Sequence, residues 1–112
     1  MKRLPKSRGG FEIGVIDIPG ARVVWCRGEL DISREKVVSD TVERVLEKDI
    51  ESLVLHLRAL TFTDCTAIRC IEHAVRACEG SGVPIYVDAG PAVKKVADAL
   101  EPQMLGPVLG RL

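Results

Sequence analysis

The chain has 112 residues, of which 46% are hydrophobic, and its 16 basic and 16 acidic residues give a formal net charge of zero. This length and hydrophobic content predict a single compact domain with a real core, not a disordered chain. A balanced charge excludes a protein that binds nucleic acid through an excess of Lys and Arg, so no direct nucleic-acid partner is expected. We expect residues 1–10 to be a flexible N-terminal tail and residues 11–112 to be the domain.

No apolar run approaches the roughly 20 residues that a membrane-spanning helix needs, and the N-terminus lacks the apolar core of a signal peptide. We therefore expect a cytoplasmic protein with no membrane insertion. In that compartment the four cysteines are expected to be free thiols, and their spacing does not resemble a zinc-ligand pattern. They are Cys26, Cys65, Cys70 and Cys78. No metal and no cofactor is expected.

The domain begins with a predicted β-hairpin. Residues 11–18 alternate roughly between apolar and polar side chains, as a half-buried strand does. Pro19-Gly20 is a strong turn signal, and residues 22–27 are β-branched and aromatic, which favours a second strand. Trp25 is expected to lie in the core.

A helix, a buried strand and a second helix follow the hairpin. Asp31 or Ser33 is the expected N-cap of the first helix, whose apolar face comprises Val38, Val42, Val45 and Leu46. Residues 52–57 are nearly continuously apolar, as in a parallel strand that is covered on both faces. Helical spacing resumes at Ala67 and is expected to end at Gly80-Ser81-Gly82. The apolar stripe of this second helix comprises Ile68, Ile71, Val75 and Cys78, with Arg69, Glu72, His73, Arg76 and Glu79 pointing outward.

The chain closes with a predicted strand and a third helix. Residues 83–87 form the strand, and Pro84 suits an edge position because proline lacks the N–H of a central strand. Pro91 fits the first turn of the helix, with Val93, Val96, Ala97 and Leu100 inward; Pro102 and Pro107 bound a loose C-terminal end. The order hairpin, α, β, α, β, α predicts an α/β fold with a mainly parallel sheet of four to five strands and helices packed on it.

Residues 61–67, Thr-Phe-Thr-Asp-Cys-Thr-Ala, join the buried strand to the second helix. They place a carboxylate, a thiol and a hydroxyl at a helix N-terminus, where unpaired N–H groups favour negative charge. Asp31 also follows a strand. Functional groups gather at the C-terminal ends of parallel strands, where helices follow. We therefore expect Asp31 and Asp64 to lie on the same edge of the sheet.

The sequence offers little for catalysis. It contains no Gly-rich phosphate loop. A thiol enzyme would have to pair Cys65 with His56 or His73, but His56 falls within the strand and His73 lies two turns along the helix. The simpler interpretation of Cys65 is a small side chain that fills space. We therefore expect no enzyme and no catalytic residue.

Three segments, in the same order, resemble the STAS domain of anti-sigma factor antagonists. They are Arg27-Gly28-Glu29-Leu30-Asp31-Ile32, the stretch from Leu53 to Ala67, and Ala89-Gly90-Pro91-Ala92-Val93-Lys94-Lys95-Val96, and the resemblance covers about residues 11–105. It implies the fold expected above. It also implies a protein that binds an anti-sigma factor with serine kinase activity, frees a sigma factor, and is released by phosphorylation at the start of the second helix.

This sequence departs from the family pattern at that point. Cys65 occupies the usual position of the acceptor serine, Ala67 replaces the usual glycine, and His56 replaces the usual strand aspartate. The neighbouring hydroxyl makes Thr66 the candidate phosphorylation site. The candidate partner-binding residues are Glu29, Asp31, Asp64, Cys65, Thr66, Arg69, Glu72 and Arg76.

Three other interpretations remain open. Within the antagonist class, the protein could be one that is never phosphorylated, or one that is controlled by oxidation of Cys65. From another class, it could be an accessory or scaffold subunit of a larger assembly, as the STAS domains of transporters are. An oligomer is possible, but the sequence does not indicate one.

Overall fold

The computed structural model describes residues 10–100. In it the chain begins with the expected hairpin, in which β1 (Phe11–Ile18) and β2 (Ala21–Leu30) are antiparallel and joined by Pro19 and Gly20. Residues 1–9 of the expected tail, and the expected loose end at Pro102 and Pro107, lie outside the described residues.

After the hairpin, helices and strands alternate as the sequence predicts. The elements are a short 3-10 helix η1 (Ile32–Arg34), α1 (Glu35–Val45), β3 (Leu53–Thr63), α2 (Cys65–Ser81), β4 (Ile85–Asp88) and α3 (Gly90–Ala99). The four strands lie in the order β1-β2-β3-β4, and β3 is parallel to both β2 and β4. The predicted α/β class is confirmed, with β4 and its preceding Pro84 at an edge.

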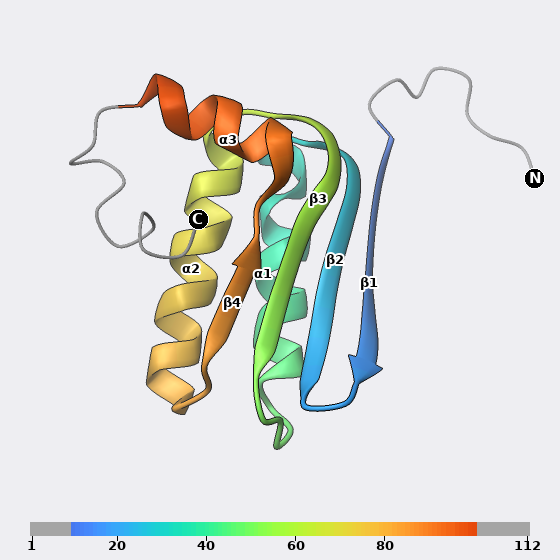
Figure 1. Cartoon of the computed structure of the whole chain (residues 1–112), viewed down its shortest axis with the longest axis vertical. Coiled ribbons are helices and arrows are strands. Elements are labelled where there is room, and N and C mark those ends of the chain that lie inside the picture. The colour runs from blue at the N-terminus through green and yellow to red at the C-terminus, as the bar shows by residue number, and fades with distance from the viewer. Residues whose placement is uncertain (1–9, 101–112) are drawn as a thin grey trace, which may run out of the picture.

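The core lies between one face of the sheet and the helices α1 and α2, which run side by side behind it in Figure 1. Side chains that are fully buried there include Val24, Leu30, Val42, Leu55, Leu57 and Ile71. Burying each of them contributes roughly 1.5–3 kcal/mol. Helix α3 crosses the end of the sheet where β3 and β4 finish, and buries Val93 in the same core.

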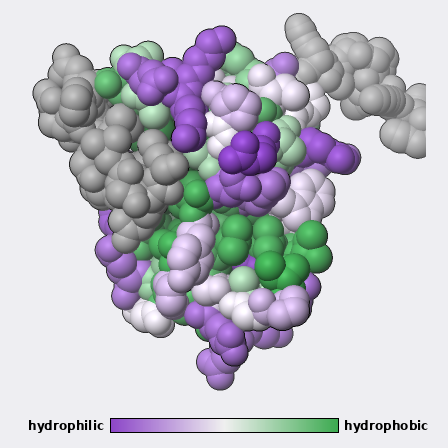
Figure 2. All heavy atoms as spheres, in the orientation of Figure 1, coloured by the Kyte–Doolittle hydropathy of each residue, from purple (hydrophilic) through white to green (hydrophobic). Residues whose placement is uncertain are grey.

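The other face of the sheet is largely open among residues 10–100. Figure 2 shows an apolar patch on this side, and the exposed Ile16 and partly exposed Val23 lie on this face beside Trp25. The prediction that Trp25 lies in the core is wrong, because strand alternation directs Val24 and Cys26 under the helices and Trp25 to the opposite face.

Two element boundaries differ from the predictions in ways that matter for the site. Strand β3 continues to Thr63, six residues beyond the predicted end at residue 57. Helix α2 then begins at Cys65, two residues before the predicted start at Ala67, with Asp64 as its N-cap. Both ends of this junction are therefore regular structure, and only Asp64 links them. The left-handed Gly82, with φ of 70°, ends α2 as predicted.

Candidate functional site

The ends of β2 and β3 bring the two predicted acidic loops together. Leu30 is the register partner of Thr63, so the next residues, Asp31 and Asp64, leave adjacent parallel strands. The hydroxyl of Thr63 donates a hydrogen bond to the carbonyl oxygen of Leu30, with a donor–acceptor distance of 2.9 Å, and ties the two strand ends. We call the surface formed by residues 29–35 and 62–69 the acidic rim.

Each aspartate of the acidic rim caps the helix that follows it. An Asp31 carboxylate oxygen accepts hydrogen bonds from the backbone N–H and the hydroxyl of Ser33, at 3.0 and 2.6 Å. An Asp64 carboxylate oxygen accepts one from the backbone N–H of Thr66, at 2.9 Å. Hydrogen bonding by Thr66, through its side chain first and its backbone second, holds the pKa of Asp64 below the usual range. Both carboxylates are thus fixed in place as part of the fold.

The first residues of α2 differ in what they present to solvent. The Cys65 side chain is exposed. Thr66 is only 1% exposed, and its hydroxyl accepts a hydrogen bond of 3.2 Å from the Arg69 guanidinium. The same guanidinium lies 3.3 Å from the Glu35 carboxylate at the start of α1. A kinase would reach the Thr66 hydroxyl only if the first turn of α2 opened, whereas the Cys65 side chain is already accessible.

The remaining predicted contact residues extend the rim in two directions. Glu29 is half-buried at the end of β2, opposite Phe62 of β3. Glu72 and Arg76 lie further along α2, with 4.0 Å between their charged groups. The structure therefore places all eight predicted residues at the rim or on the helix that leaves it.

Sequence reasoning missed two apolar residues of the acidic rim. Ile32 is 69% exposed directly after Asp31, and Phe62 is 51% exposed two residues before Asp64. Large apolar side chains that stay in solvent beside ordered charges are typical of protein interfaces. The available signal was position in the sequence, because each apolar residue lies within two residues of a predicted acidic contact.

Both histidines engage carboxylates of other elements. The Nδ1 atom of His56 lies 3.1 Å from Asp88, and Nε2 of His73 lies 2.9 Å from Glu43. Neither pairing directs an imidazole to Cys65, as a thiol nucleophile would require. Within residues 10–100 there is also no group of three or more His, Cys, Asp or Glu side chains that could hold a metal ion.

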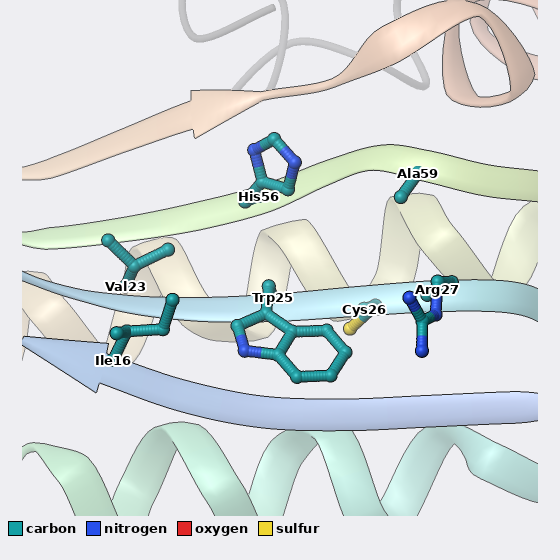
Figure 3. Close-up of a pocket in the computed structure, with 7 residues that line it drawn as sticks. All are labelled: Ile16, Val23, Trp25, Cys26, Arg27, His56 and Ala59. Carbon is teal, nitrogen blue, oxygen red and sulfur yellow. The ribbon is translucent and has the colours of Figure 1, made fainter.

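A shallow hollow on the open face of the sheet is separate from the acidic rim. Figure 3 shows Trp25 and His56 in it, on neighbouring strands. Its volume is about 360 Å³, and its lining includes Ile16, Val23, Trp25, Arg27, His56 and Ala59. The indole lies so close to Gly14 that a Cβ atom there would be 2.4 Å from the ring. His56, which departs from the family pattern, therefore belongs to this face and not to the rim.

Comparison with known proteins identifies the family. The STAS domain family matches residues 12–102, and the chain belongs to it. A search of curated proteins found no match. In the described residues, no helix is both long enough and apolar enough to span a membrane.

Three solved structures have a similar fold. An anti-sigma factor antagonist from Mycobacterium paratuberculosis superposes with a TM-score of 0.72 at 21% identity, over 83% of this chain and 80% of that one. The antagonist SpoIIAA in its unphosphorylated form gives 0.64 at 16% identity, over 92% and 99%. RsbS from Moorella thermoacetica, as a serine-to-glutamate variant, gives 0.62 at 20% identity, over 81% and 80%. At these identities the similarity establishes the fold.

Proposed function

We propose that this protein is an anti-sigma factor antagonist, which binds an anti-sigma factor with serine kinase activity through the acidic rim and thereby frees a sigma factor. The observation that carries the proposal is the arrangement of the rim itself. Asp31 and Asp64 are held side by side by adjacent strands, and each is flanked by an exposed apolar residue, Ile32 or Phe62. Family membership and the similarity of fold to two antagonists support the same assignment.

The chemistry of the rim suits a protein partner. Apolar side chains at the centre of a contact supply most of the binding energy, and surrounding charges set orientation and specificity. Ile32 and Phe62 fit the first role, and the two capping aspartates fit the second. Because the hydrogen bonds of Ser33 and Thr66 already fix these carboxylates, binding costs little side-chain entropy.

The phosphorylation switch is a separate part of the proposal. A phosphate at the start of α2 would add about −1.5 to −2 charges beside Asp64 and would repel an acidic or closely packed partner. Thr66 is the candidate acceptor, but its buried hydroxyl makes transfer slow relative to transfer to an exposed serine. The exposed position next to Asp64 carries Cys65, which a serine kinase does not phosphorylate.

The proposal is tested with purified anti-sigma kinases from the same host. Complex formation is measured by calorimetry, and phosphate transfer is measured by intact-protein mass spectrometry. We expect one kinase to bind, with slow transfer that is lost in Thr66→Ala. We expect Cys65→Ser to gain rapid transfer, because it places a hydroxyl at the exposed position. Binding without any transfer to the natural chain identifies an unswitched antagonist.

A matched pair of variants locates the interface. Phe62→Ala removes an apolar rim residue and should weaken binding by about tenfold, the effect of losing a moderate hot spot. Tyr86→Ala removes an aromatic residue of similar exposure from β4, outside the rim, and should leave affinity unchanged. If no anti-sigma kinase binds the natural chain, the antagonist proposal fails, and the accessory-subunit interpretation takes its place.

A further inference from the structure

The two edges of the sheet are built very differently. Strand β4 has four residues and follows Pro84, and both features discourage pairing with another strand. Strand β1 has eight residues, contains no proline or lysine, and pairs only with β2 within residues 10–100. Figure 1 shows it at the margin of the sheet, with no helix beside its outer edge.

The backbone of β1 offers hydrogen-bonding groups along this edge. The N–H of Glu29 donates to the carbonyl of Gly10, so Gly10 and Glu29 form a hydrogen-bonded pair of the antiparallel ladder. Such pairs alternate along a ladder, and the even-numbered residues of β1 therefore bond to β2. The N–H and C=O groups of the odd-numbered residues point away from β2, outward from the edge of the sheet. These residues are Phe11, Ile13, Val15 and Asp17.

The side chains of β1 give this edge little protection. Val15, Ile16 and Ile18 are 45, 52 and 48% exposed. The strand has two charged residues, and each already has a partner on β2 of its own chain: Glu12 forms an ion pair with Arg27, and Asp17 with Arg22. Natural edge strands commonly carry unpaired charges, prolines or bulges that prevent pairing, and β1 shows none of these.

We propose that β1 is a self-association edge, and that two copies of the chain pair their β1 strands antiparallel about a two-fold axis to form one continuous eight-stranded sheet. The occupant is a second copy because the strand is complementary to itself. Outward-facing groups must meet outward-facing groups, so odd-numbered residues pair with odd-numbered ones. The two registers with the greatest overlap then place the axis at Gly14 or at Val15.

The charges of β1 permit both of these registers. With the axis at Gly14, Glu12 lies opposite Ile16 of the second copy and Asp17 lies opposite its Phe11. With the axis at Val15, the opposite residues are Ile18 and Ile13. In neither case does one acid face another, which would destabilise the pair. The register in which all eight residues overlap would set Glu12 against Asp17, but it is excluded because it pairs odd with even positions.

A contact made by two strands and their flanking side chains is small. It falls at the low end of specific interfaces, and we expect a dissociation constant on the order of tens of micromolar. The acidic rim lies on other segments, so the proposal is independent of the proposed function. The open face with its hollow would continue across the dimer, because a two-fold axis perpendicular to the sheet keeps both open faces on the same side.

The first test is sedimentation velocity of the full chain from about 5 to 500 μM, a range chosen to bracket the affinity expected for a small interface. It is run with a reducing agent and repeated with Cys65→Ser to exclude disulfide-linked dimers. We expect the mass to rise from monomer toward dimer across this range. Val15→Lys adds a charge at the paired edge and should shift the midpoint at least tenfold. Tyr86→Lys adds the same charge at the opposite edge and should leave the midpoint unchanged.

Amide hydrogen exchange read residue by residue by NMR supplies the second test and does not depend on a variant. On dimerisation the amides of Ile13, Val15 and Asp17 should become protected at least tenfold. Those of Gly14 and Ile16 already bond to β2 and should change much less. A protein that stays monomeric up to 500 μM would overturn the proposal. So would a dimer in which the odd-numbered amides of β1 gain no protection.

Discussion

At the scale of single residues, the four cysteines should react very differently although none of them forms a disulfide. Cys65 is exposed at the start of α2, whereas burial raises the pKa of Cys26 and of Cys70 to about 12 and Cys78 is buried as well. Since the thiolate is the reactive form, we expect iodoacetamide at about pH 8 to modify the native protein rapidly once and to modify four sites after unfolding. The intact mass, followed over time, gives the number of modified cysteines in the native and in the unfolded protein. A rapid phase that persists in Cys65→Ser would contradict the assignment. The location of Cys65 and Thr66 at a helix start could be predicted from the sequence. Which of them faces solvent could not, because α2 starts two residues early and is buried over a broader face than the stripe of Ile68, Ile71, Val75 and Cys78 indicates.

At the scale of elements, the sequence predicts every α-helix and strand but not which face of the sheet the helices cover. Val23, Trp25 and His56 on one face are as large as Val24, Cys26 and Leu55 on the other, so apolar alternation cannot tell the two faces apart. The close packing at the junction between β4 and α3 could not be predicted from the sequence either, and it leads to a testable prediction. Gly90 has φ of 79°, and a Cβ atom there would lie 2.5 Å from the Cα of Arg58. Gly90→Ala should therefore lower the free energy of unfolding by at least about 1–3 kcal/mol, because the strained backbone and the close contact add. Gly80→Ala is the matched control, since Gly80 is within α2 and a Cβ atom there meets nothing within 4 Å. It should raise stability by roughly 0.5–1 kcal/mol. Urea unfolding measures both, and equal effects would refute the role given to Gly90.

At the scale of the whole molecule, stability should fall as the solution becomes acidic, because the pKa values of Asp17, Asp64 and Asp88 are all lowered in the fold. The unfolded chain takes up these protons near the ordinary aspartate pKa of about 3.9, before the folded chain does. The stabilisation from the three carboxylates is therefore complete above about pH 5, and it is lost as the pH falls through their lower folded values. For Asp88 the main cause is the hydrogen bond from Arg58, at 2.9 Å, with His56 contributing less. Arg58→Gln should lower the free energy of unfolding at pH 7 by about 1 kcal/mol or less, since the pair is partly exposed, and by much less at pH 3. The difference between the natural chain and the variant should close as the pH falls. Arg76→Gln removes an equal charge from α2, where Arg76 pairs with Glu72 and not with Asp88. The free energy of unfolding of this variant should therefore not converge on that of the natural chain through protonation of Asp88. Urea unfolding at pH 7, 5, 4 and 3 measures these differences. If the difference in the free energy of unfolding between Arg58→Gln and the natural chain stayed constant across the series, the interaction of Asp88 with Arg58 would not couple folding to pH.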